Sequence, residues 1–318
     1  MLIGAPDRNP VREGKDLFNA AYLLYEKEVK SIAHKTCLPN YDVFDEYRYF
    51  EPAYDWNIME FKGKRLAVTI CEDIWNPGDN PLYRYCPMDE LMKLKPDMMI
   101  NLSASPFDYT HDEDRKATIK SNVVKYKLPL FYCNAIGSQT EIVFDGASLV
   151  FDAAANLCGQ LPMFEEAIQS FTLNDDGTID AAVIEPASRM PDKELAPASL
   201  EENLNIKMVH DAIVLGIRDY FTKMGFTKAI IGSSGGIDSA VTLALACSAL
   251  GNENVRAVLM PSQYSTSHSV NDAEQLSLNL KNSYDIIPIE NIYKSFLEEL
   301  KPIFKDMPFS VAEENIQS

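Results

Sequence analysis

Basic residues are scarce in this sequence of 318 residues, which has 29 Lys and Arg against 47 Asp and Glu. The formal net charge of −18 argues against a broad nucleic-acid or anionic-membrane surface, because both need clustered Lys and Arg. We therefore expect neither nucleic acid nor a membrane among the partners. A small anionic ligand is still compatible with this charge, since one loop and one metal ion can hold a phosphate locally.

Metal-binding, secretory and membrane signals are also missing. Only four His accompany six Cys, and no two cysteines form a C-x-x-C pair, which argues against a zinc site and against a disulfide framework. No apolar run approaches the roughly 18 residues of a membrane-spanning helix. The N-terminal MLIGAPDRNPVREGKD lacks the apolar core of a signal peptide. These absences predict a protein of the reducing cytoplasm.

The sequence does contain alternating apolar runs and helical patterns, which are typical of an α/β fold. The predicted strands are 64–71, 97–103, 129–137, 228–232, 255–261 and 283–289, with short strands around a turn at 14–35 and a strand–turn–strand at 146–158. The predicted helices are 87–96, 112–128, 206–226, 237–251 and 269–281. Residues 185–205 have three prolines and scattered charge, so we interpret them as a linker between a domain at 1–184 and a doubly wound parallel-sheet domain at 206–318.

The segment GSSGGIDSA at 232–240 lies between a predicted strand and a predicted helix. Backbone N–H groups at a helix N-terminus bind anions, and Gly235 and Gly236 let the backbone approach a phosphate closely. The loop has no lysine, so it is not a Walker loop. Asp238 would repel phosphates unless a Mg²⁺ lay between them, so we predict it as a metal ligand. The alternative is a glycine turn followed by an acid that merely favours the first helical turn.

The string S-G-G-x-D-S resembles the pyrophosphate loop of the N-type ATP pyrophosphatases, which activate a substrate as its AMP adduct. Residues 258–276 resemble the segment that follows this loop in NAD synthetases, where the strand end lies near the adenine. The ATP contacts that the resemblance implies are Gly232, Ser233, Ser234, Gly235, Gly236, Asp238, Ser239, Leu259, Met260 and Ser265. The closing EENIQS resembles the start of that family's dinucleotide-binding segment, which implies that Glu314 and Asn315 bind deamido-NAD. A solvated helix start is the alternative there.

The stretch VTICEDIW at 68–75 ends a strand on a cysteine that two acids follow directly. Neighbouring carboxylates disfavour a thiolate, and a nucleophilic cysteine needs positive charge nearby. Cys71 is therefore either a packing residue or a nucleophile that a group distant in the sequence activates. The other cysteines are interpreted as packing residues, and they are Cys37, Cys86, Cys133, Cys158 and Cys247.

The segments HKTCLPNYDVFDEYRYFEP, ICEDIW, NLSASP and FDGASLVFD resemble the nitrilase-type amidase domain of glutamine-dependent NAD synthetases. The resemblance implies a nitrilase-like α-β-β-α sandwich followed by an adenine nucleotide alpha hydrolase-like domain. It makes Cys71 the nucleophile, Lys35 the cation that stabilises the thiolate and the oxyanion, and Glu46 the carboxylate that supports Lys35. The positions that hold the glutamine are matched by Tyr41, Glu72 and Ser105.

The sequence departs from the family at both ends. The nitrilase triad also has a glutamate base on a strand well before the lysine, and none of the 34 residues before Lys35 matches it. Glu13, Glu26 and Glu28 lie in the wrong context, and part of the second domain is missing. We therefore expect an internal fragment of a longer enzyme, with both domains truncated.

This chain expressed alone is expected to have little or no glutaminase or synthetase activity, because the glutamate base is absent. The measurement is ammonia release from glutamine, with Cys71→Ala as the control. Release that is lost in this variant would contradict the expectation.

For the parent protein the resemblance implies a ligase, a glutamine-hydrolysing NAD synthetase. Ammonia from glutamine would pass to the second domain, where ATP and Mg²⁺ adenylate deamido-NAD and ammonia displaces AMP. A homo-oligomer is expected for the full-length protein. The alternatives are another ATP-pyrophosphatase amidotransferase and a non-catalytic fragment or subunit. A stand-alone carbon–nitrogen hydrolase does not explain residues 229–276.

Overall fold

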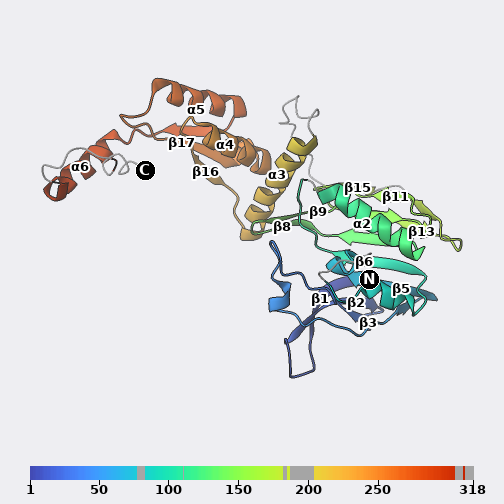
Figure 1. The fold of residues 1–318 in the computed structure, drawn as a ribbon. Coiled ribbons are helices and arrows are strands. Elements are labelled where there is room, and N and C mark those ends of the chain that lie inside the picture. Colours follow the sequence, from blue (N-terminus) through green and yellow to red (C-terminus); the bar gives the residue numbers. More distant parts are fainter. Residues whose placement is uncertain (77–82, 110, 182–184, 187–203, 305–310, 312–318) are drawn as a thin grey trace. The chain divides into compact units, whose positions relative to one another are not determined.

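The computed structural model of the chain describes residues 1–76, 83–109, 111–181, 185–186, 204–304 and 311 (Figure 1). The chain divides into two compact units. The first comprises Met1–Gly137 and Ile142–Lys193, and the second comprises Ser138–Glu141 and Glu194–Ser318. Among the described residues, no helix is long and apolar enough to cross a membrane.

A six-stranded sheet forms the centre of the first unit, in the order β11-β10-β7-β6-β5-β4. Its strands are β4 (Met59–Phe61), β5 (Lys64–Ile70), β6 (Met98–Ser103), β7 (Leu130–Asn134), β10 (Leu149–Phe151) and β11 (Leu157–Gln160). The three strands β5, β6 and β7 are parallel, and β4 and β10 run antiparallel to them. Parallel strands are buried on both faces and read as continuous apolar runs, which is why the sequence predicts all three.

Two layers cover this sheet. On one face lie α1 (Pro87–Met92) and α2 (His111–Tyr126), which bury residues such as Leu91 and Ile119 against the sheet. On the other face lies a three-stranded antiparallel sheet of β1 (Leu2–Arg8), β2 (Leu17–Tyr25) and β3 (Glu28–His34), which buries Leu23 and Ala33 against Val68. The described residues thus provide three layers of the predicted nitrilase-like sandwich, in the order helix, sheet, sheet.

Shorter elements complete the first unit. They are the 3-10 turns η1 (Glu46–Arg48) and η2 (Cys71–Ile74), and the pairs β12 (Ala167–Ile168) with β15 (Glu185–Pro186) and β13 (Phe171–Leu173) with β14 (Ile179–Ala181). The hairpin of β8 (Ile136–Gln139) and β9 (Ile142–Asp145) begins and ends in this unit, while its middle residues Ser138–Glu141 belong to the second unit. The first two residues of the predicted linker at 185–205 belong to β15, and its last two begin α3. The residues between them lie outside the described part of the chain, so the linker and the domain limits stay a prediction.

The second unit has a three-stranded parallel sheet in the order β16-β17-β18. The chain runs through α3 (Leu204–Met224), β16 (Ala229–Gly232), α4 (Ile237–Leu250), η4 (Asn252–Asn254), β17 (Val255–Leu259), α5 (Ser267–Leu280), β18 (Ser283–Ile286) and α6 (Glu290–Phe304). Leu243 and Cys247 of α4 pack on Ala257 and Leu259 of β17 to form the core. Every helix and strand of this unit except η4 and α6 matches a sequence prediction.

Two sequence interpretations need correction. Cys133 is exposed on β7 and is therefore not a packing residue, although Cys37 and Cys247 are buried as expected. The sequence also gave no sign of β1, because LIGAPDR contains a proline and two charges and is mostly half-buried or exposed. This strand forms because its whole length pairs with the apolar β2.

Candidate active site and nucleotide loop

Cys71 lies at a sharp turn where the buried strand β5 ends. It is the first residue of η2, and its φ of +45° lies in the left-handed region. Non-glycine residues rarely adopt this conformation, which costs about 1–3 kcal/mol and tends to occur at functional sites. The buried Asn101 holds the turn, since its amide donates to the Cys71 carbonyl oxygen at 3.4 Å and to Thr69 Oγ1 at 3.0 Å.

Lys35 is the cation that the acidic surroundings of Cys71 require. Its side chain is buried directly after β3, and its Nζ lies 2.5 Å from Glu46 Oε2. Asn19 donates a hydrogen bond to the other oxygen of Glu46. Burial alone would lower the pKa of Lys35, but the charges of Cys71, Glu46 and Asp73 outweigh it and raise this pKa. Lys35 is therefore a charged, fixed ammonium group that interacts with Cys71.

The environment of the Cys71 thiol nevertheless disfavours its thiolate form. Burial raises its pKa, the positive charge of Lys35 lowers it, and the negative charges of Glu72 and Glu46 raise it again. The net pKa of Cys71 lies above its ordinary value. Lys35 thus lowers the pKa of Cys71, the predicted direction, without outweighing burial.

Asp73 joins the segment that carries Lys35 to the strand that carries Cys71. One oxygen of this buried carboxylate accepts from the backbone N–H groups of Thr36 and Cys37, at 3.1 and 2.9 Å, and the other accepts from Ile70 N–H at 3.1 Å. Burial raises the pKa of Asp73 to about 6, although these N–H donors and Lys35 lower it. The sequence analysis did not single out this residue. The available signal was an acid just beyond the end of a buried strand. A carboxylate at such a place is buried as well, so it needs several hydrogen-bond donors.

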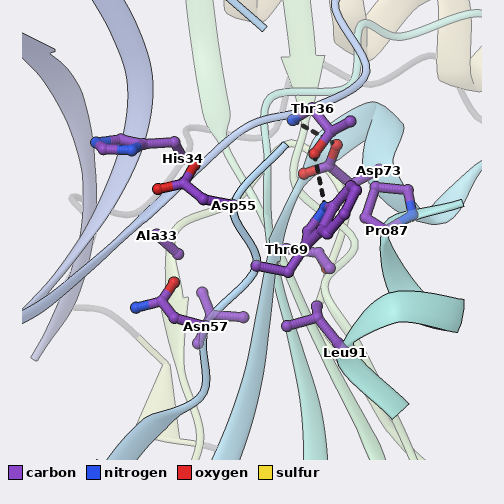
Figure 2. A pocket seen from close by; sticks show the side chains of 11 residues that line it. Ala33, His34, Thr36, Asp55, Asn57, Thr69, Asp73, Pro87 and Leu91 are labelled. Atoms are coloured by element: carbon purple, nitrogen blue, oxygen red, sulfur yellow. Dashed lines mark hydrogen bonds between the residues drawn. The ribbon is translucent and has the colours of Figure 1, made fainter. Parts of the chain in front are cut away.

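Figure 2 shows Asp73 beside Thr36 at a small cavity in this part of the unit. Trp56 also lines the cavity, and its indole N–H donates to Thr36 Oγ1 at 3.0 Å. Neither Lys35 nor Cys71 lines it. The cavity therefore lies beside His34 and Thr36, the neighbours of Lys35 in the chain, and it is not the place where a substrate would contact the Cys71 thiol.

Glu72, predicted to hold glutamine, is buried next to Cys71. Its Oε1 accepts hydrogen bonds from Tyr41 at 2.9 Å and from Tyr83 at 3.1 Å. Tyr41 was predicted from the sequence. Tyr83 was missed, and no sequence signal pointed to it.

Ser105, the third predicted glutamine contact, lies just beyond β6 and is buried. Its backbone N–H donates to Asn134 Oδ1 at 2.9 Å. Asn134 Nδ2 donates in turn to Asp145 at 3.0 Å and to the carbonyl oxygen of Gly146 at 2.9 Å. Within the described residues, no hydrogen bond joins Ser105 to Cys71 or Glu72, so the structure places it in a neighbouring buried network.

An ion pair of Arg115 with Asp145 is the centre of that network. Two nitrogens of the Arg115 guanidinium donate to the two oxygens of Asp145, at 2.8 and 2.5 Å, and the two side chains are 1% and 2% exposed. The sequence analysis missed this pair. A signal was present in α2, because Arg115 stands four residues before the buried Ile119 on the face that packs against the sheet.

The predicted phosphate loop of the second unit joins β16 to α4. Gly235 has a φ of +84°, and a Cβ atom there would lie 2.1 Å from the Ser269 carbonyl oxygen. Ser239 Oγ accepts from Ser234 N–H at 3.2 Å, and Asp238 lies in the first turn of α4. Ser233 Oγ is buried and has no hydrogen-bond partner among the described residues. Two adjacent glycines, an unused buried hydroxyl and a helix N-terminus without a side-chain cap fit a phosphate group.

The other predicted nucleotide contacts lie at the end of β17 and beyond. The Leu259 side chain is buried in the core and its carbonyl oxygen accepts from Ile287 N–H, whereas Met260 is half-exposed with its Cε close to Gly232. Ser265 is exposed and hydrogen-bonds with Ser262 in a turn. Glu314 and Asn315 lie outside the described residues. No group of three or more His, Cys, Asp or Glu that could hold a metal occurs in the described part of the chain.

Known sequences and structures resemble this chain over most or all of its length. Residues 209–318 match the NAD synthase family. The chain is 36% identical to a glutamine-dependent NAD(+) synthetase of Synechocystis sp., with 100% of this chain and 56% of that protein covered, and 36% identical to one of Thermotoga maritima, with 96% and 55% covered. The solved glutamine-dependent NAD+ synthetase of Acinetobacter baumannii, a complex with ADP, has a TM-score of 0.83 at 31% identity, covering 100% of this chain and 56% of that one.

The fold is that of an α/β chain in which a nitrilase-like layered unit precedes a unit with a parallel sheet and a glycine loop. By sequence and fold, the chain resembles glutamine-dependent NAD+ synthetases over its whole length, and residues 209–318 match the NAD synthase family. It spans about half the length of the curated relatives it matches, 56% of the Synechocystis protein. The predicted fold class and family are thereby confirmed.

Proposed function

We propose that the chain is part of a glutamine-hydrolysing NAD synthetase, a ligase that makes ammonia at one site and uses it at another. The observation that carries the proposal is the combination of two features in one chain. A buried Lys35–Glu46 pair acts on a cysteine in a strained turn, and a lysine-free glycine loop opens the helix α4.

In the first unit, Cys71 Sγ would attack the side-chain amide carbon of glutamine. The tetrahedral intermediate would release ammonia and leave a γ-glutamyl thioester, which water hydrolyses to glutamate. Lys35 and the backbone N–H of Glu72 would stabilise the oxyanion, and Glu46 keeps Lys35 in place. Glu72, Tyr41 and Ser105 would hold the glutamine.

In the second unit, the phosphates of ATP would lie on the loop that carries Ser233, Gly235 and Ser239. The nicotinate carboxylate of deamido-NAD would attack the α-phosphate and release pyrophosphate, and ammonia would then displace AMP. A carboxylate needs this activation because it is a poor electrophile. Asp238 is the residue that would hold a Mg²⁺, which neutralises phosphate charge when it is bound.

The proposal extends to the location and assembly of the parent protein. All six cysteines are free, which agrees with a reducing cytoplasm. A homo-oligomer is proposed for the full-length protein, and light scattering coupled to size-exclusion chromatography tests it.

Substrate-dependent release of pyrophosphate from ATP tests the function. In the protein that contains this chain, deamido-NAD is expected to trigger the release, and xanthylate or aspartate is not. Gly235→Ala is the matched control, because its Cβ would lie 2.1 Å from the Ser269 carbonyl oxygen and would close the loop. Release triggered by xanthylate or aspartate instead would favour another ATP-pyrophosphatase amidotransferase.

A further inference from the structure

The Glu72 carboxylate is buried without a cation. It is 6% exposed, and among the described residues it forms no ion pair with Lys, Arg or His. Lys35, the nearby ammonium group, is paired with Glu46 instead. Residues 77–82, which connect η2 to Tyr83, contain neither Lys nor Arg. A buried charge without a partner is costly, so its presence points to a cationic group that belongs to a ligand.

The two hydrogen bonds that Glu72 does accept come from neutral groups and reach one oxygen only. Tyr41 and Tyr83 both donate to Oε1, while Oε2 accepts no hydrogen bond within the described part of the chain. Phenols stabilise a carboxylate without cancelling its charge. Burial and the charge of Glu72 raise the pKa of both tyrosines, so each keeps its O–H at neutral pH.

The two phenols reach Glu72 from different parts of the chain. Tyr41 follows the Lys35 segment and is 45% exposed, whereas Tyr83 precedes α1 and is half-buried. A single exposed phenol would leave the carboxylate free to rotate, and the second one fixes it. With Oε1 occupied from two sides, Oε2 is the atom left for a ligand.

We propose that Tyr83 is a positioning residue that directs Glu72 Oε2 at the α-ammonium group of the amide substrate. Together with Tyr41, it makes the site select amino-acid amides over amides that lack an ammonium group. This inference rests on the proposed glutamine-hydrolysing function and adds the residue that determines this part of its specificity.

Protection of Cys71 from alkylation tests the proposal without requiring turnover. Iodoacetamide modifies the thiol, and mass spectrometry of the tryptic peptide 66–84 follows Cys71 alone, since it is the only cysteine in that peptide. The two protecting ligands are L-glutamine and glutaramate, which has the same amide and carboxylate but lacks the ammonium group. In the parent chain, L-glutamine is expected to protect at the lower concentration.

Tyr83→Phe is expected to raise the half-protecting concentration of L-glutamine about 10-fold, the size expected for one lost hydrogen bond to a charged group. The value for glutaramate stays unchanged. Tyr85→Phe is the matched control, because this partly exposed phenol packs against Tyr54 and Trp56 and makes no hydrogen bond with Glu72. It is expected to leave both values unchanged.

Three results would overturn the proposal. If Tyr83→Phe raises the half-protecting concentrations of both ligands equally, Tyr83 has only a structural role. If it raises neither, Tyr83 does not contribute to substrate binding. If Tyr83→Phe alters the alkylation rate without ligand, Tyr41→Phe replaces it and has to show the same selective loss. Absence of protection by either ligand in the parent chain would instead contradict the proposed function itself, and the inference with it.

Discussion

Replacement of Arg115 by Met is expected to lower the free energy of unfolding of the first unit by about 3–5 kcal/mol, the cost of leaving one member of a buried ion pair without its partner. Asp145 would stay buried at 2% exposure with its two charge-assisted hydrogen bonds removed. The effect reaches the candidate site, because Asp145 also accepts from Asn134, which accepts from the Ser105 backbone.

Guanidinium chloride unfolding followed by tryptophan fluorescence measures this loss. Both tryptophans, Trp56 and Trp75, belong to the first unit, so the signal reports that unit alone. Lys120→Met is the control, since this lysine is exposed on the same helix and surface changes stay within about 0.5 kcal/mol.

The double variant Arg115→Met/Asp145→Leu tests the physical reason. It removes both charges, so it is expected to recover a substantial part of the lost stability. A free energy of unfolding for Arg115→Met within about 1 kcal/mol of that of the parent chain would contradict the prediction. A double variant as unstable as the single one would show that packing, and not the stranded charge, causes the loss.

Replacement of Lys35 by Met is expected to slow the alkylation of Cys71 at pH 7 by roughly 3- to 30-fold. Lys35 lowers the pKa of this thiol, and loss of a nearby opposite charge raises a pKa by about 1–3 units. At a pH below the pKa, the thiolate fraction falls tenfold for each unit. The higher intrinsic nucleophilicity of a more basic thiolate offsets about half of this decrease.

The measurement is the rate of iodoacetamide alkylation of Cys71 between pH 6 and 10. The midpoint of the profile should move to higher pH in Lys35→Met, because the thiol keeps its proton longer. Lys30→Met is the matched control, since Lys30 forms an exposed ion pair with Glu28 on β3. Its profile should equal that of the parent chain.

Cys37 provides an internal check on this experiment. It is 1% exposed and lies two residues from Lys35, so it reacts only if the segment opens. An unchanged midpoint for Cys71 with Cys37 still protected would refute the assigned role of Lys35. Rapid modification of both cysteines would show that Lys35 holds the segment together rather than tuning the thiol.

The helices and strands that the sequence predicted are those whose own residues show a recognisable apolar pattern. The runs LAVTI and MMINLS are mostly apolar, because strands buried on both faces need no strict alternation. The elements that were missed depend on a partner elsewhere in the chain. β1 pairs with β2, and the two-residue strand β12 pairs with β15, which lies 17 residues further along.

The candidate site divides in the same way. Lys35, Glu46 and Cys71 were reached through a resemblance of whole segments, and the structure brings these three together. Asp73 and Tyr83 were missed. Asp73 acts on Thr36 and Cys37, which are more than 30 residues away in sequence, and such contacts leave no local pattern.

Local pattern was enough to predict the strand–glycine loop–helix of the second unit and the cysteine at the end of a buried strand, while Lys35 was reached through the family resemblance. The partner of each buried charge became known only from the folded chain. The fold pairs Lys35 with Glu46, places two phenols on Glu72 and raises the pKa of the Cys71 thiol through burial. The reason is that the strength of an electrostatic interaction depends on distance and burial, and both quantities arise only when distant segments pack together.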